Sequence, residues 1–314
     1  MADSGDICRG EQLRRESVAA LDEVLGQPFG VLDGGFVRVV DYMGSDAAIV
    51  QAARVSYGKG TKQVSQDRGL IRYLLRHRHT TPFEMCEIKL HVRVPMDVWR
   101  QWIRHRTANV NEYSTRYSLA IEEAHCTAAD AWRSQGESNR QGSGAALPES
   151  VGAGLSAAEA ELHRQSRAIY DARIAQGVAR EQARKDLPLS TYTEAYWKID
   201  LHNLLHFLAL RMEEHAQYEI RAYATTIGRE IVSRWVPLAW EAFEDYHLEA
   251  TSLSRDALAL LRLLNENKPA EAREYASSRG LATRDKDGKT WRLSREAREL
   301  EALLATINIA SPWS

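Results

Sequence analysis

The sequence predicts an α+β fold, in which a strand-bearing first half precedes a second half of long helices. Residues 36–42 and 87–94 show the β-branched clustering and two-residue alternation of strands. Residues 156–185 and 194–235 show long runs in which apolar side chains recur at helical spacing. Strand patterns confined to the first half of a chain and followed by long helical patterns are typical of the α+β class.

The composition indicates a globular chain without a strong overall charge. Of its 314 residues, 44% are hydrophobic and 27% charged, and 41 basic against 43 acidic residues leave a formal net charge of −2. We therefore expect no nucleic-acid or membrane partner, and any anion-binding site must be local. The N-terminus lacks the apolar segment of a secretory signal, and no apolar run approaches a membrane span, which predicts a cytoplasmic protein.

Residues 1–30 are predicted to form a helix added in front of the main domain. The apolar residues that recur at helical spacing are Leu13, Val18, Leu21 and Leu25. Gly26 and Pro28 then end the pattern. We expect an N-terminal appendage here and one functional domain over residues 31–250.

The main domain is expected to open with a strand and two helices. Residues 36–42 are rich in β-branched and aromatic side chains between glycine-containing turns, which favours a strand. Ser45 is placed to cap a helix over residues 46–55. After a loop, residues 67–78 carry one apolar stripe and predict a second helix.

Residues 87–94 form the clearest strand pattern in the chain, because four apolar residues alternate with polar ones. The apolar set is Ile88, Leu90, Val92 and Val94. Pro95 ends this strand and is suited to begin a helix. That helix is expected to lead into residues 98–117.

Residues 98–117, VWRQWIRHRTANVNEYSTRY, concentrate arginines, amides and hydroxyls among tryptophans and tyrosines. Guanidinium groups present planar sets of donors that match phosphate or the carbonyl edge of a base, and aromatic faces can stack on a ring. We therefore predict a site for an anionic, planar ligand. Surface ion pairs are one alternative, and a nucleic-acid-binding module is another, against which the near-zero net charge and the single compact cluster argue.

The second half leaves further alternatives open. Residues 127–156 are dense in Gly, Ser, Asn and Gln, which suits a linker or an ordered loop over a site. Arg211 and His215 share one face of the second long helix, which suits either ligand binding or salt bridges along the helix. His202 and His206 have the spacing of a metal-binding pair, but no acidic residue lies between them, and no metal site is predicted.

Residues 251–314 are predicted to form a helical C-terminal extension. Three segments rich in Arg and Glu show helical spacing, and residues 285–288 carry a turn signal. Their charge pattern is most simply that of a solvated helical surface, without a chemical signature.

Taken together, several stretches resemble the flavin-dependent thymidylate synthases. The signature of that family, RHRxxSxNExSxRY, stands here as RHRTANVNEYSTRY over residues 104–117. The likeness continues in FVRVVDYMGSD, HTTPFE, WRSQGESNRQGS, ARKDLPLSTYT and NLLHFLALRMEEHAQYEIRAYA. It covers residues 33–250 in the same order, which is far more specific than RHR alone.

The resemblance implies a fold, a reaction and an assembly. The fold would be a mixed sheet flanked by long helices, in subunits that form a homotetramer with shared active sites. The reaction would be the reductive methylation of a uracil nucleotide at C5, which converts dUMP to dTMP. In it 5,10-methylenetetrahydrofolate would give the carbon, FAD would carry the electrons and NADPH would reduce the flavin.

The resemblance also assigns expected roles to residues of this chain. Arg211 matches the arginine that contacts the uracil and activates C5. The other positions assigned to the nucleotide are Gln101, Arg104, Glu112, Ser114, Arg116 and Arg184, with Asn109 beside them. The positions assigned to the flavin and its partners are Ser56, His79, Thr81, Glu84, Arg104, His105, Arg106, Glu112, Asp200, His202 and His206.

Four positions depart from the family pattern. Asn109 and Val110 stand where the family usually has Ser-Tyr, and Asp200 and His202 stand where it often has Asn and Arg. Asn109 could add a hydrogen bond to a ribose 2′-hydroxyl. The alternative is therefore a variant methylase that accepts UMP as well as dUMP, as in nucleoside-antibiotic biosynthesis. Asp200 and His202 leave open a non-catalytic member of the family.

The cysteines favour a route without an enzyme thiolate. Conventional thymidylate synthase attacks C6 with an accessible, activated cysteine. Here Cys8, Cys86 and Cys126 are widely spaced without a CxxC pair, which indicates neither a disulfide framework nor a zinc cluster. Cys86 lies in an apolar strand pattern, and we expect it to be packed. A hydride- and flavin-mediated methylation is therefore predicted.

Overall fold

The protein divides into two compact units, residues 1–249 and 250–314. The computed structural model describes residues 15–55, 64–136, 142–286, 288 and 290–313. Within these residues, no helix has the length and apolar character needed to cross a membrane.

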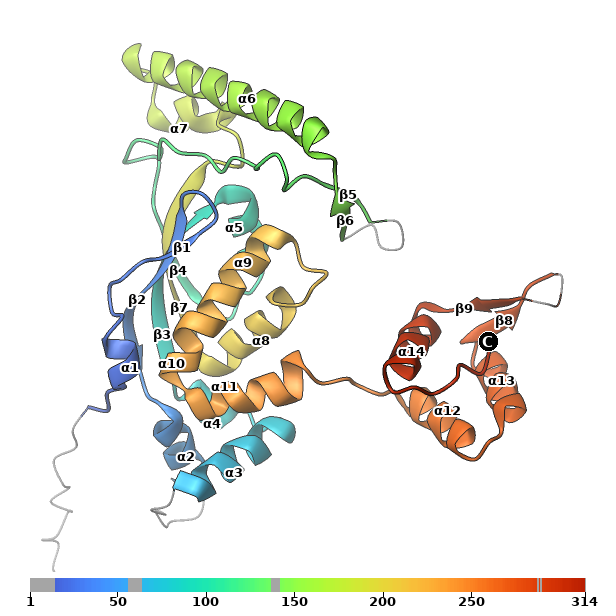
Figure 1. Cartoon of the computed structure of the whole chain (residues 1–314). Coiled ribbons are helices and arrows are strands. Elements are labelled where there is room, and N and C mark those ends of the chain that lie inside the picture. The colour runs from blue at the N-terminus through green and yellow to red at the C-terminus, as the bar shows by residue number, and fades with distance from the viewer. Residues whose placement is uncertain (1–14, 56–63, 137–141, 287, 289, 314) are drawn as a thin grey trace, which may run out of the picture. The chain divides into compact units, whose positions relative to one another are not determined.

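The first unit is built on a five-stranded sheet (Figure 1). Its strands, in spatial order, are β1 (Phe29–Val31), β2 (Gly35–Met43), β3 (Glu87–Pro95), β7 (Tyr192–Asp200) and β4 (Asn109–Glu112). Every pairing is antiparallel, whereas a mixed sheet was expected. The α+β class itself is confirmed. Two small antiparallel hairpins lie outside this sheet: β5 (Arg133–Gln135) with β6 (Ser143–Ala146), and β8 (Ala282–Arg284) with β9 (Trp291–Leu293).

Helices α5, α8 and α9 of the first unit cover one face of the sheet, whereas α6 and α7 lie beyond its end (Figure 1). The elements before β4 are α1 (Ala19–Asp22), α2 (Asp46–Val55), α3 (Val64–Arg76), α4 (Thr81–Glu84) and α5 (Met96–Trp102). Those between β6 and β7 are α6 (Glu149–Ala175), α7 (Arg180–Ala183) and the 3-10 turn η1 (Arg184–Asp186). Those after β7 are α8 (Leu201–Arg211), α9 (Tyr218–Thr226), the π-helix η2 (Ile227–Val232), α10 (Ser233–Trp235), α11 (Pro237–Phe243) and the π-helix η3 (Glu244–Leu248).

The core lies between the sheet and these helices and is centred on aromatic rings. Trp102 of α5 packs against Trp197 of β7 and Phe207 of α8, with ring centroids 5.2 Å and 5.1 Å away. Tyr223 of α9 completes the cluster at 5.7 Å from Trp102. All four side chains are buried. This packing fixes the end of α5, from which the arginine-rich segment departs, next to α8.

The prediction of one helix over residues 194–235 was wrong, because its first part is the strand β7. In β7 the residues Thr193, Ala195, Trp197 and Ile199 are buried in alternation with polar side chains. The strand pairs with β3 along its whole length, from Glu87↔Asp200 to Pro95↔Tyr192. The prediction extended the helical spacing found after residue 200 back to residue 194. It overlooked the two-residue alternation of residues 193–199, which pairing with β3 stabilises as a strand.

The long helix predicted over residues 156–185 begins and ends earlier than expected. Pro148 occupies the position before α6, which then runs from Glu149 to Ala175. Gly177 follows with a φ of 78°, a left-handed conformation that glycine tolerates and that ends helices. In residues 127–156, the ordered hairpin β5–β6 stands where a linker was one alternative.

The N-terminal segment differs from an independent helical appendage. Its described part forms only the four-residue α1, and Leu21 of that turn is fully buried in the main core. The strand β1 already begins at Phe29 and pairs with β2. The described residues before β2 therefore contribute to the sheet and the core.

The C-terminal unit has a hydrophobic core of its own, where a solvated helical surface was expected. Its helices are α12 (Arg255–Asn265), α13 (Pro269–Ser278) and α14 (Arg295–Thr306). They bury Leu260, Ala276 and Leu304 together with the hairpin β8–β9, whose connection spans the predicted turn. The small buried alanines let the three helices and the hairpin approach closely, a feature that charge patterning does not reveal.

Candidate active site

The arginine-rich segment leaves the core at the end of α5. Trp99 and Trp102 are buried, whereas Arg104 and Arg106 are exposed immediately after the helix ends. Neither arginine forms a hydrogen bond or an ion pair with the described residues. The segment after the helix thus presents two guanidinium groups that have no partner among the described residues, which suits an anion-binding role.

His105, between these arginines, turns toward α8. Arg211, the last residue of α8, donates from Nε to His105 Nε2 at 3.1 Å. The His105 ring also contacts Phe207, with centroids 4.9 Å apart, and lies 6.1 Å from His206. The structure therefore brings Arg211 together with two of the residues expected near the flavin.

Protonation of this pair follows from its surroundings. Burial, followed by the charges of Arg211 and His206, lowers the pKa of His105 to about 4. His105 is therefore neutral near pH 7, with its proton on Nδ1 because Nε2 accepts from Arg211. Burial also lowers the pKa of Arg211, whose guanidinium nonetheless stays charged. Its two terminal nitrogens form no hydrogen bond with described residues and remain available to a ligand.

A cavity of about 310 Å³ lies between the end of α3, α4, α8 and η3, and His206, whose ring lies 6.1 Å from that of His105, is part of its lining. Its polar lining is entirely basic or hydroxylic and consists of Arg78, His79, Thr80, His202, His206 and His247. The rest is apolar and includes Leu74, Phe83, Leu205 and Phe243. No carboxylate lines it among the residues that the structure describes. The predicted residues His79, His202 and His206 thus converge on one cavity.

Three polar lining residues, Arg78, Thr80 and His247, were not predicted from the sequence. His247 lies in the π-helix η3, with its ring stacked on Phe243 at 5.3 Å. Burial, followed by the charge of Arg78, lowers the pKa of His247. The i, i+4 spacing of an aromatic residue and a histidine was the available signal, but π-helical geometry cannot be read from one sequence.

The lining fits the flavin group that the resemblance implies. An apolar wall with a few convergent donors is the usual chemistry of a cofactor site, and the volume lies at the lower end of such cavities. Thr81 and Glu84 lie on α4, whose Phe83 lines the cavity. Ser56 lies outside the described residues.

A second group of expected residues gathers around the segment after β4. Arg184 donates to the hydroxyl of Thr115, and Arg116 donates to Glu181 at 3.1 Å. Ser114 accepts the backbone N–H of Arg116 at 3.4 Å. The three nucleotide candidates Ser114, Arg116 and Arg184 therefore lie together, away from direct contact with Arg211.

Gln101 and Glu112 have other partners. Gln101 of α5 donates to Gln217, the residue before α9. Glu112 accepts from the hydroxyl of Thr193 at 2.9 Å, and Asn109 is exposed at the start of the edge strand β4. The side chains of Gln101, Asn109 and Glu112 are all accessible to solvent.

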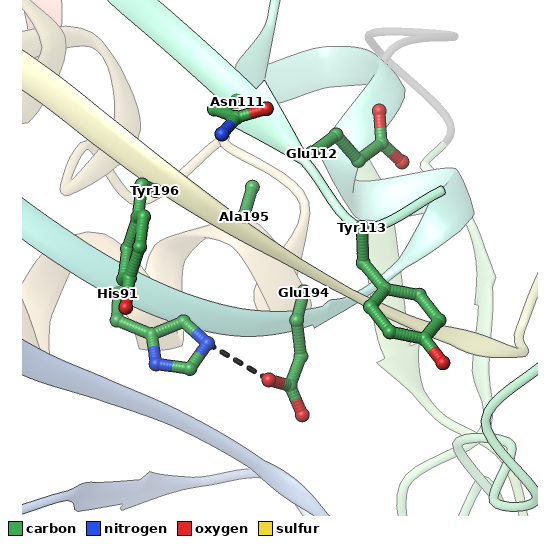
Figure 2. A pocket seen from close by; sticks show the side chains of 7 residues that line it. All are labelled: His91, Asn111, Glu112, Tyr113, Glu194, Ala195 and Tyr196. Atoms are coloured by element: carbon green, nitrogen blue, oxygen red, sulfur yellow. Dashed lines mark hydrogen bonds and ion pairs between the residues drawn. The ribbon is translucent and has the colours of Figure 1, made fainter. Parts of the chain in front are cut away.

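Figure 2 shows a smaller hollow of about 200 Å³ on the sheet face that the helices leave open. His91 points toward Glu194 with Nε2 and Oε2 2.8 Å apart, and Glu112 points away from this pair. Arg38 donates from Nε to Nδ1 of His91 at 2.9 Å, so a neutral His91 donates to Glu194. This network satisfies its own hydrogen bonds, which favours a structural role over a ligand site.

Asp200 has a structural role that the sequence did not predict. Its carboxylate caps α8 by accepting the backbone N–H of Asn203 at 2.9 Å, and its second oxygen accepts the Asn203 amide at 2.6 Å. A carboxylate at this position suits a helix N-terminus, where positive partial charge accumulates. The same residue therefore positions His202 and His206 on the next turns.

Neither described cysteine is activated. Burial raises the pKa of the Cys86 thiol to about 12. Burial and the carboxylates of Asp33 and Glu159 raise the pKa of Cys126. Cys8 lies outside the described residues. A thiolate nucleophile therefore has no support in this part of the chain.

Within the described chain, the one group of potential metal ligands close enough to share an ion is Glu213, Glu214 and His215, and all three are exposed. His202 and His206 do not belong to it. Exposed acidic groups of this kind are common on surfaces and carry no metal assignment here.

Comparison with known proteins agrees with this geometry. The sequence model of the family described as "Thymidylate synthase complementing protein" matches residues 38–238. Two relatives named flavin-dependent thymidylate synthase come from Wolbachia pipientis wMel and Gluconobacter oxydans (strain 621H). The first is 54% identical over 254 residues, which cover 81% of this chain and 89% of the relative. The second is 52% identical over 275 residues, which cover 83% and 89%.

Solved structures of similar fold include the UMP/dUMP methylase PolB from Streptomyces cacaoi. Its complex with 5-Br dUMP has a TM-score of 0.64 at 30% identity, covering 70% of this chain and 98% of that chain. Its complex with 5-Br UMP has a TM-score of 0.63 at 30% identity, covering 69% and 96%. The arginine-rich segment, its convergence with Arg211 and these similarities together confirm the resemblance, and the chain belongs to the flavin-dependent thymidylate synthase family.

Proposed function

We propose that the protein catalyses the FAD-dependent reductive methylation of dUMP at C5 to give dTMP. The carbon comes from 5,10-methylenetetrahydrofolate, and NADPH reduces the flavin. The observation that carries this proposal is the Arg211–His105 pair beside a basic, partly apolar cavity. Relatives above 50% identity that are named thymidylate synthases support dUMP as the substrate.

Arg211 is suited to activate the pyrimidine. Attack by C5 on an electrophilic carbon is favoured when the imide of the uracil carries negative charge. A half-buried guanidinium next to the imide stabilises that charge more strongly than water does. His105 accepts from Nε and thereby directs the two terminal nitrogens of Arg211 away from itself, toward the ligand.

His105 supports this role by remaining neutral. A protonated imidazole could no longer accept from Arg211, and the two cations would repel each other. The low pKa of His105 keeps this interaction intact well below pH 7. The chemistry that FAD would supply here, once bound and reduced by NADPH, is the hydride needed to convert the transferred methylene group into a methyl group.

The ligands are divided between the two groups of residues. We assign the nucleotide to Gln101, Arg104, Asn109, Glu112, Ser114, Arg116, Arg184 and Arg211. We assign the flavin and its partners to Ser56, His79, Thr81, Glu84, Arg104, His105, Arg106, Glu112, Asp200, His202 and His206. The unpaired guanidinium groups of Arg104 and Arg106 and the basic lining of the cavity support this division. A single mononucleotide site also accounts for the cluster better than a nucleic-acid-binding module does.

A homotetramer with shared active sites is part of the proposal. Apolar and aromatic side chains near the nucleotide candidates are exposed: Val110 at 46%, Tyr113 at 39% and Tyr117 at 75%. Exposed apolar groups that lie next to charged ligand-binding residues are typical of surfaces that a partner subunit covers. Sedimentation of the flavin-loaded protein measures the number of subunits, and a monomer would contradict this part.

Acceptance of UMP is the second candidate. It is favoured by the structural similarity to a methylase whose solved complexes contain 5-Br UMP and 5-Br dUMP. Asn109, exposed on the edge strand, is the residue available to hydrogen-bond a 2′-hydroxyl. Equal rates on dUMP and UMP would support this reading, whereas no turnover of UMP would remove it.

The test begins with the purified protein, which should be yellow because bound flavin absorbs at about 450 nm. After anaerobic reduction by NADPH, methylenetetrahydrofolate and dUMP are added and the product is identified by mass. We expect dTMP; a hydroxymethyl product would redirect the assignment. Arg211→Ala should retain flavin and lose turnover by about 100-fold or more, as for a lost electrostatic contact in a transition state. Turnover at the wild-type rate would contradict the role of Arg211.

A further inference from the structure

One residue of the cavity adopts a backbone conformation that its side chain disfavours. Arg78 has a φ of 58°, in the left-handed region. It stands just after α3, where Arg78 N–H donates to the carbonyl of Leu75 at 3.1 Å and His79 N–H to that of Leu74 at 2.9 Å. This hydrogen-bonding pattern ends many helices, and glycine usually occupies the left-handed position because it has no Cβ.

The side chain of Arg78 has no structural partner that explains its presence. It lines the cavity, yet it forms no hydrogen bond or ion pair with the described residues. Four histidines also line the cavity, and the charge of Arg78 contributes, after burial, to the lowered pKa of one of them, His247. Arg78 is exposed to solvent, which screens its charge, and its guanidinium is therefore free to bind an anion at the cavity wall.

We infer that Arg78 is an anion-binding residue of this cavity, which contacts the negatively charged group of the ligand that fills it. The inference rests on the proposed function and deepens it. Unfavourable backbone conformations persist where the site needs a particular side chain, and here that side chain is a guanidinium that lines a partly apolar cavity. The ligand class is an aromatic ring system that bears an anionic group.

Two anionic groups meet this description in the proposed reaction. One is the phosphate of a dinucleotide, FAD or NADPH, and the other is the carboxylate tail of the folate. A guanidinium binds either group through paired donors, so the chemistry at Arg78 is shared. Three separate measurements distinguish the sources.

The variants are Arg78→Gly, Arg78→Lys and, as a matched control, Arg76→Ala. Arg76 is an exposed arginine two residues earlier that does not line the cavity and contacts the ring of Tyr246. The measurements are the Kd of FAD for the stripped protein, the rate of flavin reduction against NADPH concentration, and the KM for methylenetetrahydrofolate. Melting temperature is recorded for each variant.

We expect Arg78→Gly to weaken one of the three ligands by about tenfold, the size of one lost charge-assisted hydrogen bond. Its Tm should equal or exceed that of the wild type, since glycine tolerates the left-handed conformation. Arg78→Lys should recover part of the affinity, because charge remains while the paired donors are lost. Arg76→Ala should bind all three ligands as the wild type does.

Wild-type affinity for all three ligands in Arg78→Gly would overturn the inference. A lowered Tm together with a loss that Lys does not restore would also overturn it, because a role in ending α3 would explain both. Failure of the wild-type protein to bind flavin would count against the proposed function instead. The role of Arg78 would then be decided by the Kd values of NADPH and methylenetetrahydrofolate, measured by direct binding to the wild type and to Arg78→Gly.

Discussion

Replacement of His105 by glutamine should flatten the dependence of stability on pH. The folded chain holds the pKa of His105 at about 4, below its ordinary value of 6.5, chiefly through burial and then through the charge of Arg211. As the pH falls below about 6.5, the imidazole of His105 becomes protonated in the unfolded chain but not in the folded chain. The contribution of neutral His105 to the free energy of unfolding is therefore complete above about pH 6.5 and is lost progressively toward pH 4.

The magnitude follows from the two pKa values. Between about pH 7.5 and pH 5 they correspond to a loss of about 2 kcal/mol from the free energy of unfolding. His105 is only half-buried, so solvent screening reduces the expected loss to about 1 kcal/mol. His105→Gln removes the titration while its amide oxygen can still accept from Arg211. The wild type should therefore lose about 1 kcal/mol more than the variant over this range.

Urea unfolding of the flavin-free protein at the two pH values measures this difference. Subtracting the variant from the wild type cancels every other titrating group. Arg211→Met is an internal check, because it removes the second cause of the shift and leaves burial; its pH dependence should lie between the other two. An equal pH dependence in wild type and His105→Gln would refute the protonation state assigned to the site.

Three further perturbations test the fold and the mechanism. Burial raises the pKa of Asp46 to about 6, so its contribution to stability falls as the pH rises from about 4 to 6. In urea unfolding, Asp46→Asn should therefore lower the free energy of unfolding more at pH 4.5 than at pH 7.5. A Cβ on Gly228 would lie 2.7 Å from the Trp240 ring; Gly228→Ala should cost about 1–3 kcal/mol by thermal melting, and an unchanged Tm would contradict the packing. Because burial raises the pKa of the Cys86 thiol, Cys86→Ala should retain the wild-type rate of steady-state turnover. Loss of turnover with intact flavin and nucleotide binding would instead support a thiolate mechanism.

Part of the fold could be predicted because its signals are local. The alternation in residues 87–94 corresponds to β3, where every second residue is buried. Ser45 accepts the N–H of Ala47 at 3.0 Å at the start of α2, as its capping position predicted. Neither feature needs information from distant residues.

Other elements could not be predicted, since they depend on distant partners. Residues 194–200 become a strand only because β3 lies beside them, and the intrinsic preference of their side chains permits a helix. The core of the C-terminal unit depends on alanines whose burial is decided by the approach of neighbouring helices. The contribution of Arg78 and His247 to one cavity depends on the packing of α3 against the end of the first unit.

The family and the expected chemistry could be recognised from the order of residue types along the chain: RHR, seven residues and Ser, with Arg211 much later. Which of these residues come into contact could not be recognised in this way, because it depends on the folded chain. The folded chain pairs Arg211 with a neutral His105, it gathers Ser114, Arg116 and Arg184 elsewhere, and it uses Asp200 to cap a helix. The physical reason is that contact and desolvation, which set hydrogen-bond partners and pKa values, arise between segments far apart in the chain.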